Sequence, residues 1–460
     1  MKTGIAASTI GALLWMALTA GAPPQPRGQK WVAAWAASMH GPYPSGNPVA
    51  QPVLDMAFES AARGAVDQTF RQIVRPAIWG PQVRLRFANT FGTQPVTFGS
   101  VFVGLQTAGA EVARGTNQRV TFNGKPGVTL PAGGSSFSDP VALSFVAKTQ
   151  PPLLDGRKLA VSVHISDPSG PMTWHAKALQ SSYLSPPRSG DHTADESGAA
   201  FPFSTTSWYF LAAVDVLASA DTEGIVCFGD SITDGTASTL NGDDRWPDVL
   251  AARLRAAHAG RYAVVNAGIG GNRITGPSSY DPGSPFAGGP SALDRLERDV
   301  LSSSGVSSVI WLEGINDLSS GATADAVIAG IKEGVSRIRA RRAIRIVLAT
   351  ITSALGSTGA AGTADVDAKR QAVNAFIRSA GIFDGVVDFD AATRDPATGG
   401  LRPEFRPNSS IGGAGDALHP NRAGYLAMGT AVDLRLLTPR TAIVVSAEVS
   451  VARELSTSFP

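Results

Sequence analysis

A short apolar run that ends abruptly in polar, turn-forming residues limits the possible folds of this chain more than any other segment. Residues 225–228 read Ile-Val-Cys-Phe, and the chain turns polar at once with Gly229-Asp230-Ser231. A buried strand of an open parallel sheet has this pattern, and such sheets bind ligands at the carboxyl ends of their strands. The run therefore predicts that Ser231 lies at a ligand-binding edge. Gly-Asp-Ser also occurs in many ordinary turns, so this segment alone does not identify a nucleophile.

Three further segments continue the pattern. Residues 264–272 form a second apolar run that ends in a glycine cluster, and residues 309–317 form a third that ends in Gly-Ile-Asn-Asp. Residues 416–420 read Asp-Ala-Leu-His-Pro. Serine, glycine, asparagine and an Asp-x-x-His thus follow one another in this order. The chain in this respect resembles the SGNH, or GDSL-type, hydrolases, whose four sequence blocks carry these residues, and the resemblance covers roughly residues 222–438.

The chemistry of ester cleavage explains why these residue types occur together. A serine nucleophile needs a base within hydrogen-bond reach, a group that orients the base, and donors for the oxyanion. Ser231 is the predicted nucleophile and His419 the predicted base, because imidazole exchanges protons near neutral pH. Asp416 precedes His419 by three residues, so one loop can present both side chains. Without the other blocks, this pair would read as a capped turn before Pro420.

The resemblance also implies an oxyanion hole. Its donors would be the backbone N–H of Ser231, the backbone N–H of Gly271 and the side-chain amide of Asn316. Gly271 lacks a Cβ, so a ligand can approach its backbone closely. Asn316 offers a donor without a charge to desolvate. The plain alternatives are a turn glycine and a helix cap.

Competing motifs are absent from the sequence. There is no Gly-x-Ser-x-Gly elbow, and the glycine cluster at 268–271 has Arg273 where the dinucleotide fingerprint needs its third glycine. There is no His-Glu-x-x-His, paired Cys-x-x-Cys or Walker A sequence either. We therefore expect no metal and no cofactor.

Composition and the N-terminus suggest an exported chain. A formal net charge of +2 gives no basic stripe, so no nucleic-acid partner is implied. Residues 1–22 resemble a signal peptide, with Lys2, a short apolar stretch and an Ala20-Gly21-Ala22 cleavage site. The expected location is secreted or periplasmic, without stable membrane insertion. An uncleaved anchor is the alternative.

The 460 residues predict two main domains that differ in style. Residues 31–218 read as short strands separated by Gly and Pro turns, which predicts an all-β sandwich, jelly-roll-like. Residues 222–438 alternate strands with helices, which predicts an α/β fold with a doubly wound parallel sheet. The first half, which opens with Trp31-Val-Ala-Ala-Trp35, resembles the N-terminal domain of a subgroup of secreted SGNH esterases. Residues 439–460 stay unassigned.

These observations predict a secreted serine esterase that works through an acyl-enzyme intermediate. The expected substrate is a small-molecule or polysaccharide ester with a short acyl group, acetyl in the first place, on a carbohydrate. The first alternative is a lipase or lysophospholipase. The second is a carbohydrate-binding protein whose hydrolase half is inert. The sequence leaves the alcohol and the oligomeric state open.

Overall fold

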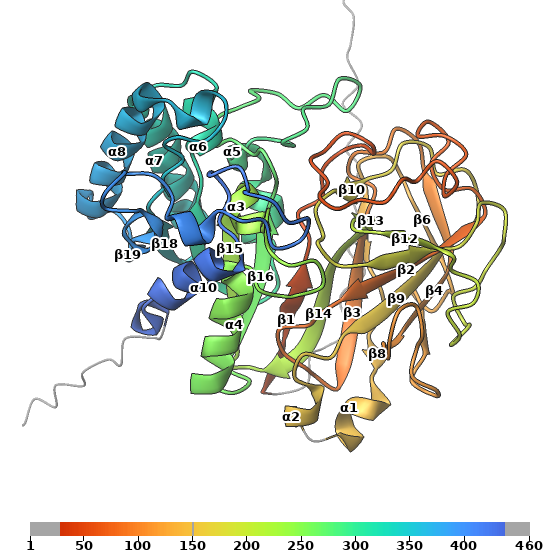
Figure 1. The fold of residues 1–460 in the computed structure, drawn as a ribbon. Coiled ribbons are helices and arrows are strands. Elements are labelled where there is room, and N and C mark those ends of the chain that lie inside the picture. Colours follow the sequence, from red (N-terminus) through yellow and green to blue (C-terminus); the bar gives the residue numbers. More distant parts are fainter. Residues whose placement is uncertain (1–27, 150, 438–460) are drawn as a thin grey trace, which may run out of the picture.

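The structure is a computed structural model that describes residues 28–149 and 151–437. The predicted signal peptide (1–22) and the unassigned tail (439–460) lie outside the described residues. The chain forms a β-rich region (residues 28–219) and an α/β region (residues 223–437), which lie side by side in Figure 1. Strand β1 of the β-rich region packs against β16 of the α/β region.

The β-rich region consists of two antiparallel sheets and a short strand pair. Its elements are β1 (Gln29–Ala36), β2 (Gln68–Val74), β3 (Gln82–Ala88), β4 (Val96–Leu105), β5 (Gln118–Val120), β6 (Val128–Leu130), β7 (Ser135–Phe137), β8 (Val141–Ala142), α1 (Ser144–Lys148), α2 (Pro151–Leu154), β9 (Leu159–Ile165), β10 (Trp174–His175), β11 (Ser182–Leu184), β12 (Phe203–Thr205), β13 (Trp208–Tyr209) and β14 (Leu211–Ser219). One sheet has the order β1-β14-β3-β7, with β8 beside β3. The other has the order β12-β11-β2-β9-β4-β5, with β6 beside β4, and β10 pairs with β13.

A single apolar core joins the two large sheets of the β-rich region. Along β3, buried Val83, Leu85 and Phe87 alternate with partly exposed residues, as in a strand with one face in the core. The rings of Phe87 on β3 and Phe98 on β4 lie 5.1 Å apart, so the two sheets pack face to face. This arrangement confirms the predicted all-β half of the chain.

The α/β region is built on a five-stranded parallel sheet with the order β16-β15-β17-β18-β19. Its elements are β15 (Glu223–Gly229), α3 (Ser231–Asp234), α4 (Trp246–Ala257), β16 (Tyr262–Gly268), α5 (Ala292–Leu296), η1 (Glu297–Leu301), β17 (Val306–Leu312), α6 (Ile315–Ser319), α7 (Ala324–Arg341), β18 (Arg345–Ala349), η2 (Ala360–Gly362), α8 (Ala364–Ser379), β19 (Gly385–Val387), α9 (Phe389–Thr393), η3 (Pro403–Phe405), α10 (Arg422–Ala431) and η4 (Leu434–Leu436).

Both faces of this sheet are covered by helices. Successive residues of β15 point to opposite faces, so Ile225 and Cys227 pack in one core with α4 and α10. Val226 and Phe228 pack in the other core, with α5, α7 and α8. This explains why β15 is apolar throughout rather than alternating. The structure confirms the predicted doubly wound parallel sheet and makes Cys227 a buried apolar residue.

The sheet brings the sequence blocks to one edge. Ser231 comes two residues after the end of β15, Gly271 follows β16, and Asn316 follows β17. These three strands are neighbours, and parallel strands end at the same edge of their sheet. The spacing along the chain is therefore converted into proximity in space.

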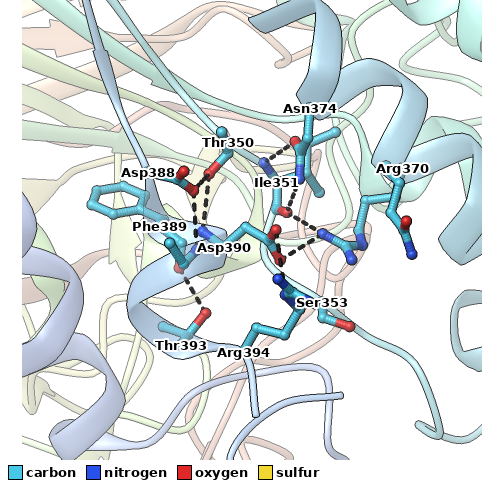
Figure 2. Close-up of polar contacts among 12 residues, drawn as sticks. Thr350, Ile351, Ser353, Arg370, Asn374, Asp388, Phe389, Asp390, Thr393 and Arg394 are labelled. Atoms are coloured by element: carbon cyan, nitrogen blue, oxygen red, sulfur yellow. Dashed lines mark hydrogen bonds and ion pairs between the residues drawn. The ribbon is translucent and has the colours of Figure 1, made fainter. Parts of the chain in front are cut away.

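A network of buried polar side chains lies at the same edge of the parallel sheet, at the end of β18. The Arg370 guanidinium donates to the Ile351 carbonyl at 2.9 Å and to the Asp390 carboxylate at 2.7 Å (Figure 2). The Asn374 side chain donates to the Ile351 carbonyl and accepts from the Ile351 N–H, both at 2.8 Å. The hydroxyl of Thr350 accepts from the Asp390 N–H at 2.9 Å. Helices α8 and α9 are thereby fixed to the strand end.

None of the helices in the two described stretches of the chain has the length and apolar character that a membrane-spanning segment requires.

Candidate active site

The side chains of Ser231, His419 and Asp416 form a hydrogen-bonded chain. His419 Nε2 lies 2.8 Å from Ser231 Oγ, and His419 Nδ1 lies 2.5 Å from Asp416 Oδ2. A carboxylate only accepts hydrogen bonds, so Nδ1 carries the ring proton and Nε2 of the neutral ring is free to accept from the serine hydroxyl. This arrangement has the geometry that proton transfer from a serine to a base requires.

Asp416 is held by its own turn. Its Oδ1 accepts the backbone N–H groups of Leu418 at 3.0 Å and His419 at 2.8 Å, while Ala417 between them adopts a φ of 57°. Partial burial would raise the pKa of Asp416, but the His419 ring and these two N–H groups outweigh it and hold that pKa well below its usual range. Asp416 is therefore an anion that fixes and can stabilise the imidazole.

Ser231 opens the short helix α3, and Asp230 caps it. Asp230 Oδ1 accepts the Ile232 N–H at 2.9 Å. The N–H of Ser231 lies at the first helical position, where no intrahelical acceptor exists. Burial raises the pKa of Asp230 to about 7, so near neutral pH Asp230 carries less negative charge beside this helix start than an exposed aspartate would.

The other two expected oxyanion donors follow the neighbouring strands β16 and β17, Gly271 in a loop and Asn316 in the short helix α6. Gly271 has a φ of +83°, a conformation that favours glycine, and within residues 28–149 and 151–437 its N–H donates to no acceptor. The Asn316 amide donates one hydrogen to the Asn272 carbonyl at 2.9 Å. Because an amide nitrogen carries two hydrogens, the second remains for a ligand.

Hydrogen bonds with Asp317 and Arg295 hold the loop that carries Gly271 in place. The Asp317 carboxylate accepts the N–H of Ile274 at 2.8 Å and both the N–H and hydroxyl of Thr275, at 3.1 and 3.0 Å. Arg295, fully buried, donates to Asn272 Oδ1 at 2.7 Å and to the Gly229 carbonyl at 2.8 Å. These contacts fix the loop after β16 against the strand end that leads to Ser231.

The β-rich region also reaches this loop, which the sequence did not predict. Asn47 donates to the Gly270 carbonyl at 2.7 Å, and His175 contacts Asp234 of α3 at 3.0 Å. Lys177 donates to the Thr236 hydroxyl and is buried. Asp234 could have been suspected, since it lies three residues after Ser231. Asn47, His175 and Lys177 stand at no spacing from the four sequence blocks that could have predicted these contacts.

Comparison with known proteins identifies the α/β region. Residues 227–427 match the GDSL-like lipase/acylhydrolase family. The chain carries a GDSL-like lipase/acylhydrolase domain. It is a carboxylic ester hydrolase. No curated protein matches the chain.

The GDSL-like domain is also similar to solved structures. A carbohydrate acetylesterase family member from Sinorhizobium meliloti is 19% identical, with a TM-score of 0.35 over 47% of this chain and 99% of that one. An aryl esterase from M. smegmatis is 18% identical, with a TM-score of 0.34 over 46% of this chain and 96% of that one. A GDSL-like lipase from Bacteroides thetaiotaomicron is 18% identical, with a TM-score of 0.34 over 47% and 88%.

Proposed function

We propose that the protein is an exported serine esterase that removes short acyl groups, acetyl in the first place, from carbohydrate esters. The observation that carries the catalytic part is the contact of His419 Nε2 with Ser231 Oγ at 2.8 Å, together with the Asp416 carboxylate on the far side of the ring. This is the arrangement that activates a serine for acyl transfer.

The reaction proceeds in two steps. Ser231 Oγ attacks the acyl carbon while its proton passes to His419 Nε2, and the carbonyl oxygen becomes an oxyanion held by the Ser231 N–H, the Gly271 N–H and the Asn316 amide. The ester C–O bond then breaks, the leaving alcohol takes the proton from Nε2, and an acyl-enzyme remains. Water attacks this acyl group with Nε2 as base, which releases the acid and restores Ser231.

The surroundings of the site favour a short acyl group. The Asn47 amide, the Lys177 ammonium and the Thr236 hydroxyl lie at or next to the loop that bears Gly271. Each added methylene of a substrate gains about 0.8 kcal/mol only where it is fully buried among apolar groups. A polar site offers little of this gain, so activity should not rise with acyl length.

A polar groove between the two regions favours a carbohydrate. It has a volume of about 520 Å³ and is lined in part by Gln106, Arg157, Tyr183 and Asn241. Asn241 belongs to the loop between α3 and α4, and its neighbour Leu240 donates through its N–H to Ser410, which precedes Asp416 in the last loop. Hydrogen-bonding side chains with a tyrosine ring suit a sugar better than an acyl chain.

An apolar cavity elsewhere does not favour the lipase alternative. It has a volume of about 390 Å³ and is lined by Ile78, Trp79, Leu154 and Tyr262, among others. Tyr262 begins β16, whereas the loop bearing Gly271 follows its end at Gly268. A strand of this length spans about 20 Å. An acyl chain bound at Ser231 would have to cross that distance to enter this cavity.

The proposal is tested with p-nitrophenyl esters of increasing acyl length and with acetylated xylan, with Ser231→Ala as the blank. We expect kcat/KM to be highest for the acetate and to fall with length, and the wild type alone to release acetate from the polymer. Rates that climb toward C8 would overturn it in favour of the lipase. Export is tested separately by sequencing the N-terminus of the protein recovered outside the cytoplasm, which should begin near Pro23.

A further inference from the structure

Contacts that originate in the β-rich region hold the loop after β16 on both sides of Gly270. The Gly270 carbonyl accepts from Asn47 Nδ2 at 2.7 Å. The Gly270 N–H donates to Asp234 Oδ2 at 2.9 Å, and Asp234 Oδ1 lies 3.0 Å from His175 Nε2. The peptide group before Gly270 is therefore held through its N–H, and the peptide group after Gly270 is held through its carbonyl.

The contact from Asn47 bears directly on the Gly271 N–H. The carbonyl of Gly270 and the N–H of Gly271 belong to one planar peptide group, and in a trans peptide they point in opposite directions. Fixing the carbonyl therefore aims the N–H. Asn47 also touches Gly271 itself, because its Nδ2 lies 2.8 Å from where a Cβ on Gly271 would stand. A rotated peptide would turn the N–H away from the oxyanion and lose the Asn47 bond.

The second contact passes through a buried ion pair. His175 Nδ1 faces the Ser38 carbonyl at 2.9 Å, and Nε2 faces Asp234 at 3.0 Å and the Lys177 carbonyl at 3.2 Å. Both ring nitrogens face only acceptors, so both carry protons and the ring is a cation. Burial lowers the pKa of His175, but the Asp234 charge and the hydrogen bonds outweigh it and raise that pKa.

Lys177 closes the space on the same side. Its Nζ lies 2.6 Å from where a Cβ on Gly270 would stand, and it donates to the Thr236 hydroxyl. The ammonium is thus packed against the loop, and any side chain at Gly270 would displace it. Asn47 and Lys177 of the β-rich region therefore pack directly against Gly270, and His175 acts on it through Asp234.

We propose that the β-rich region completes the oxyanion hole: Asn47 is a positioning residue that aims the Gly271 N–H, and the His175–Asp234 pair holds the preceding peptide. This rests on the proposed function, because it assigns the Gly271 N–H to the oxyanion. The β-rich region is then part of the catalytic machinery and not only an accessory to it.

The test uses the full chain with three variants, Asn47→Ala, Asn47→Asp and Ser45→Ala. Asn47→Ala removes the hydrogen bond, and we expect kcat to fall about tenfold with KM almost unchanged, because one orienting hydrogen bond is worth about 1 kcal/mol or slightly more. Asn47→Asp keeps the shape but sets a carboxylate against the Gly270 carbonyl, and kcat should fall further, about a hundredfold. Affinity for a trifluoromethyl ketone, which forms an oxyanion with the enzyme, should fall by the same factors.

Ser45→Ala is the matched control. Ser45 lies in the same loop and also donates to a carbonyl of the α/β region, that of Pro285 at 3.3 Å, but it does not touch Gly270. Its kcat should stay within twofold of the wild type. Circular dichroism and thermal midpoints establish that each variant is folded.

The outcomes separate the two proposals. A wild type that hydrolyses no ester overturns the proposed function. An active wild type with a folded Asn47→Asp variant whose kcat stays within twofold overturns the positioning role alone. A rise in KM without a fall in kcat also overturns it, because Asn47 would then be a ground-state contact to the substrate.

Discussion

At the site, one histidine from each region contacts an aspartate, and the two pairs differ in what the second ring nitrogen faces. His419 turns Nε2 to the Ser231 hydroxyl, which can donate a proton. His175 turns its other nitrogen to a backbone carbonyl, which cannot. The first pair is partly exposed, with side-chain exposures of 14% and 43%, whereas the second is buried at 4% and 1%. A His–Asp contact alone therefore does not mark a catalytic base, and the partner of the second nitrogen decides its role.

The largest expected effect concerns the exposed pair. His419→Ala should lower kcat by about 10⁴–10⁶-fold, and Asp416→Asn by about 10²–10⁴-fold, since the asparagine leaves the ring in place but favours the wrong tautomer. Stability should change little, because these side chains are not fully buried. Steady-state kinetics on p-nitrophenyl acetate and thermal midpoints measure both. A His419→Ala enzyme that keeps a tenth of the activity would break the comparison.

The next effect compares the proposed oxyanion donor Asn316 with the proposed positioning residue Asn47. Asn316→Ala should lower kcat by about 10²–10³-fold, because its hydrogen bond strengthens as charge develops on the acyl oxygen. This exceeds the tenfold loss expected for Asn47→Ala. Measured on the same ester, an Asn316→Ala loss smaller than that of Asn47→Ala would reverse the assigned roles.

The buried pair should show the opposite balance of activity and stability. His175→Gln removes the cation that is hydrogen-bonded to the buried Asp234 carboxylate, and removing one partner of such a pair costs about 3–5 kcal/mol of stability. The kcat of the folded fraction should fall by about tenfold at most, because the variant disturbs the hydrogen bond that holds the Gly270 N–H and leaves the proposed base, His419, unchanged. Urea unfolding and kinetics below the unfolding transition measure the two. A fall in kcat as large as that of His419→Ala would mean that His175 transfers protons.

The same pair predicts a pH dependence of stability. The pKa of His175 is raised above 6.5, so its contribution is fully present below pH 6.5 and is lost as the pH rises through the raised value. The pKa of Asp234 is lowered, so its contribution is present above pH 3.8 and is lost as the pH falls below it. The stability difference between wild type and His175→Gln should therefore shrink on either side of this window. A constant difference from pH 4 to pH 10 would mean that the pair is not ionic.

The smallest expected effect on activity concerns Glu313, which lies under the site. Burial raises its pKa to about 8, against the opposing charge of Arg295, whose guanidinium lies 4.0 Å from it; the Trp311 indole donates to it at 2.9 Å. Because this pKa is raised above the ordinary value of 4.5, the protonated carboxyl makes its full contribution to stability below pH 4.5. This contribution is lost as the pH rises through about 8. Glu313→Gln should raise the thermal midpoint at pH 9, change it little at pH 5, and leave kcat unchanged. A midpoint that drops at pH 9 would contradict this.

The sequence was informative for the candidate site residues that come just after a strand. Ser231, Gly271 and Asn316 each come just after a strand, and a parallel sheet gathers such positions at one edge, so their proximity could be predicted. The alternation of strands and helices likewise predicted the doubly wound sheet, which the structure confirms. The contacts of Asn47 and His175 could not be predicted, because they depend on how the β-rich region packs against the α/β region. Asn47 lies in a loop and His175 on a two-residue strand, and neither position carries a periodic signal.

The most direct test of the account is covalent labelling with a fluorophosphonate, followed by mass spectrometry of the digested protein. The account predicts a single adduct on Ser231 in the wild type and in folded His175→Gln, with slower labelling of Asn47→Asp, and no adduct in Ser231→Ala. An adduct on another residue, or undiminished labelling of folded Ser231→Ala, would contradict it. The absence of any label on the wild type would instead support the inert carbohydrate-binding alternative.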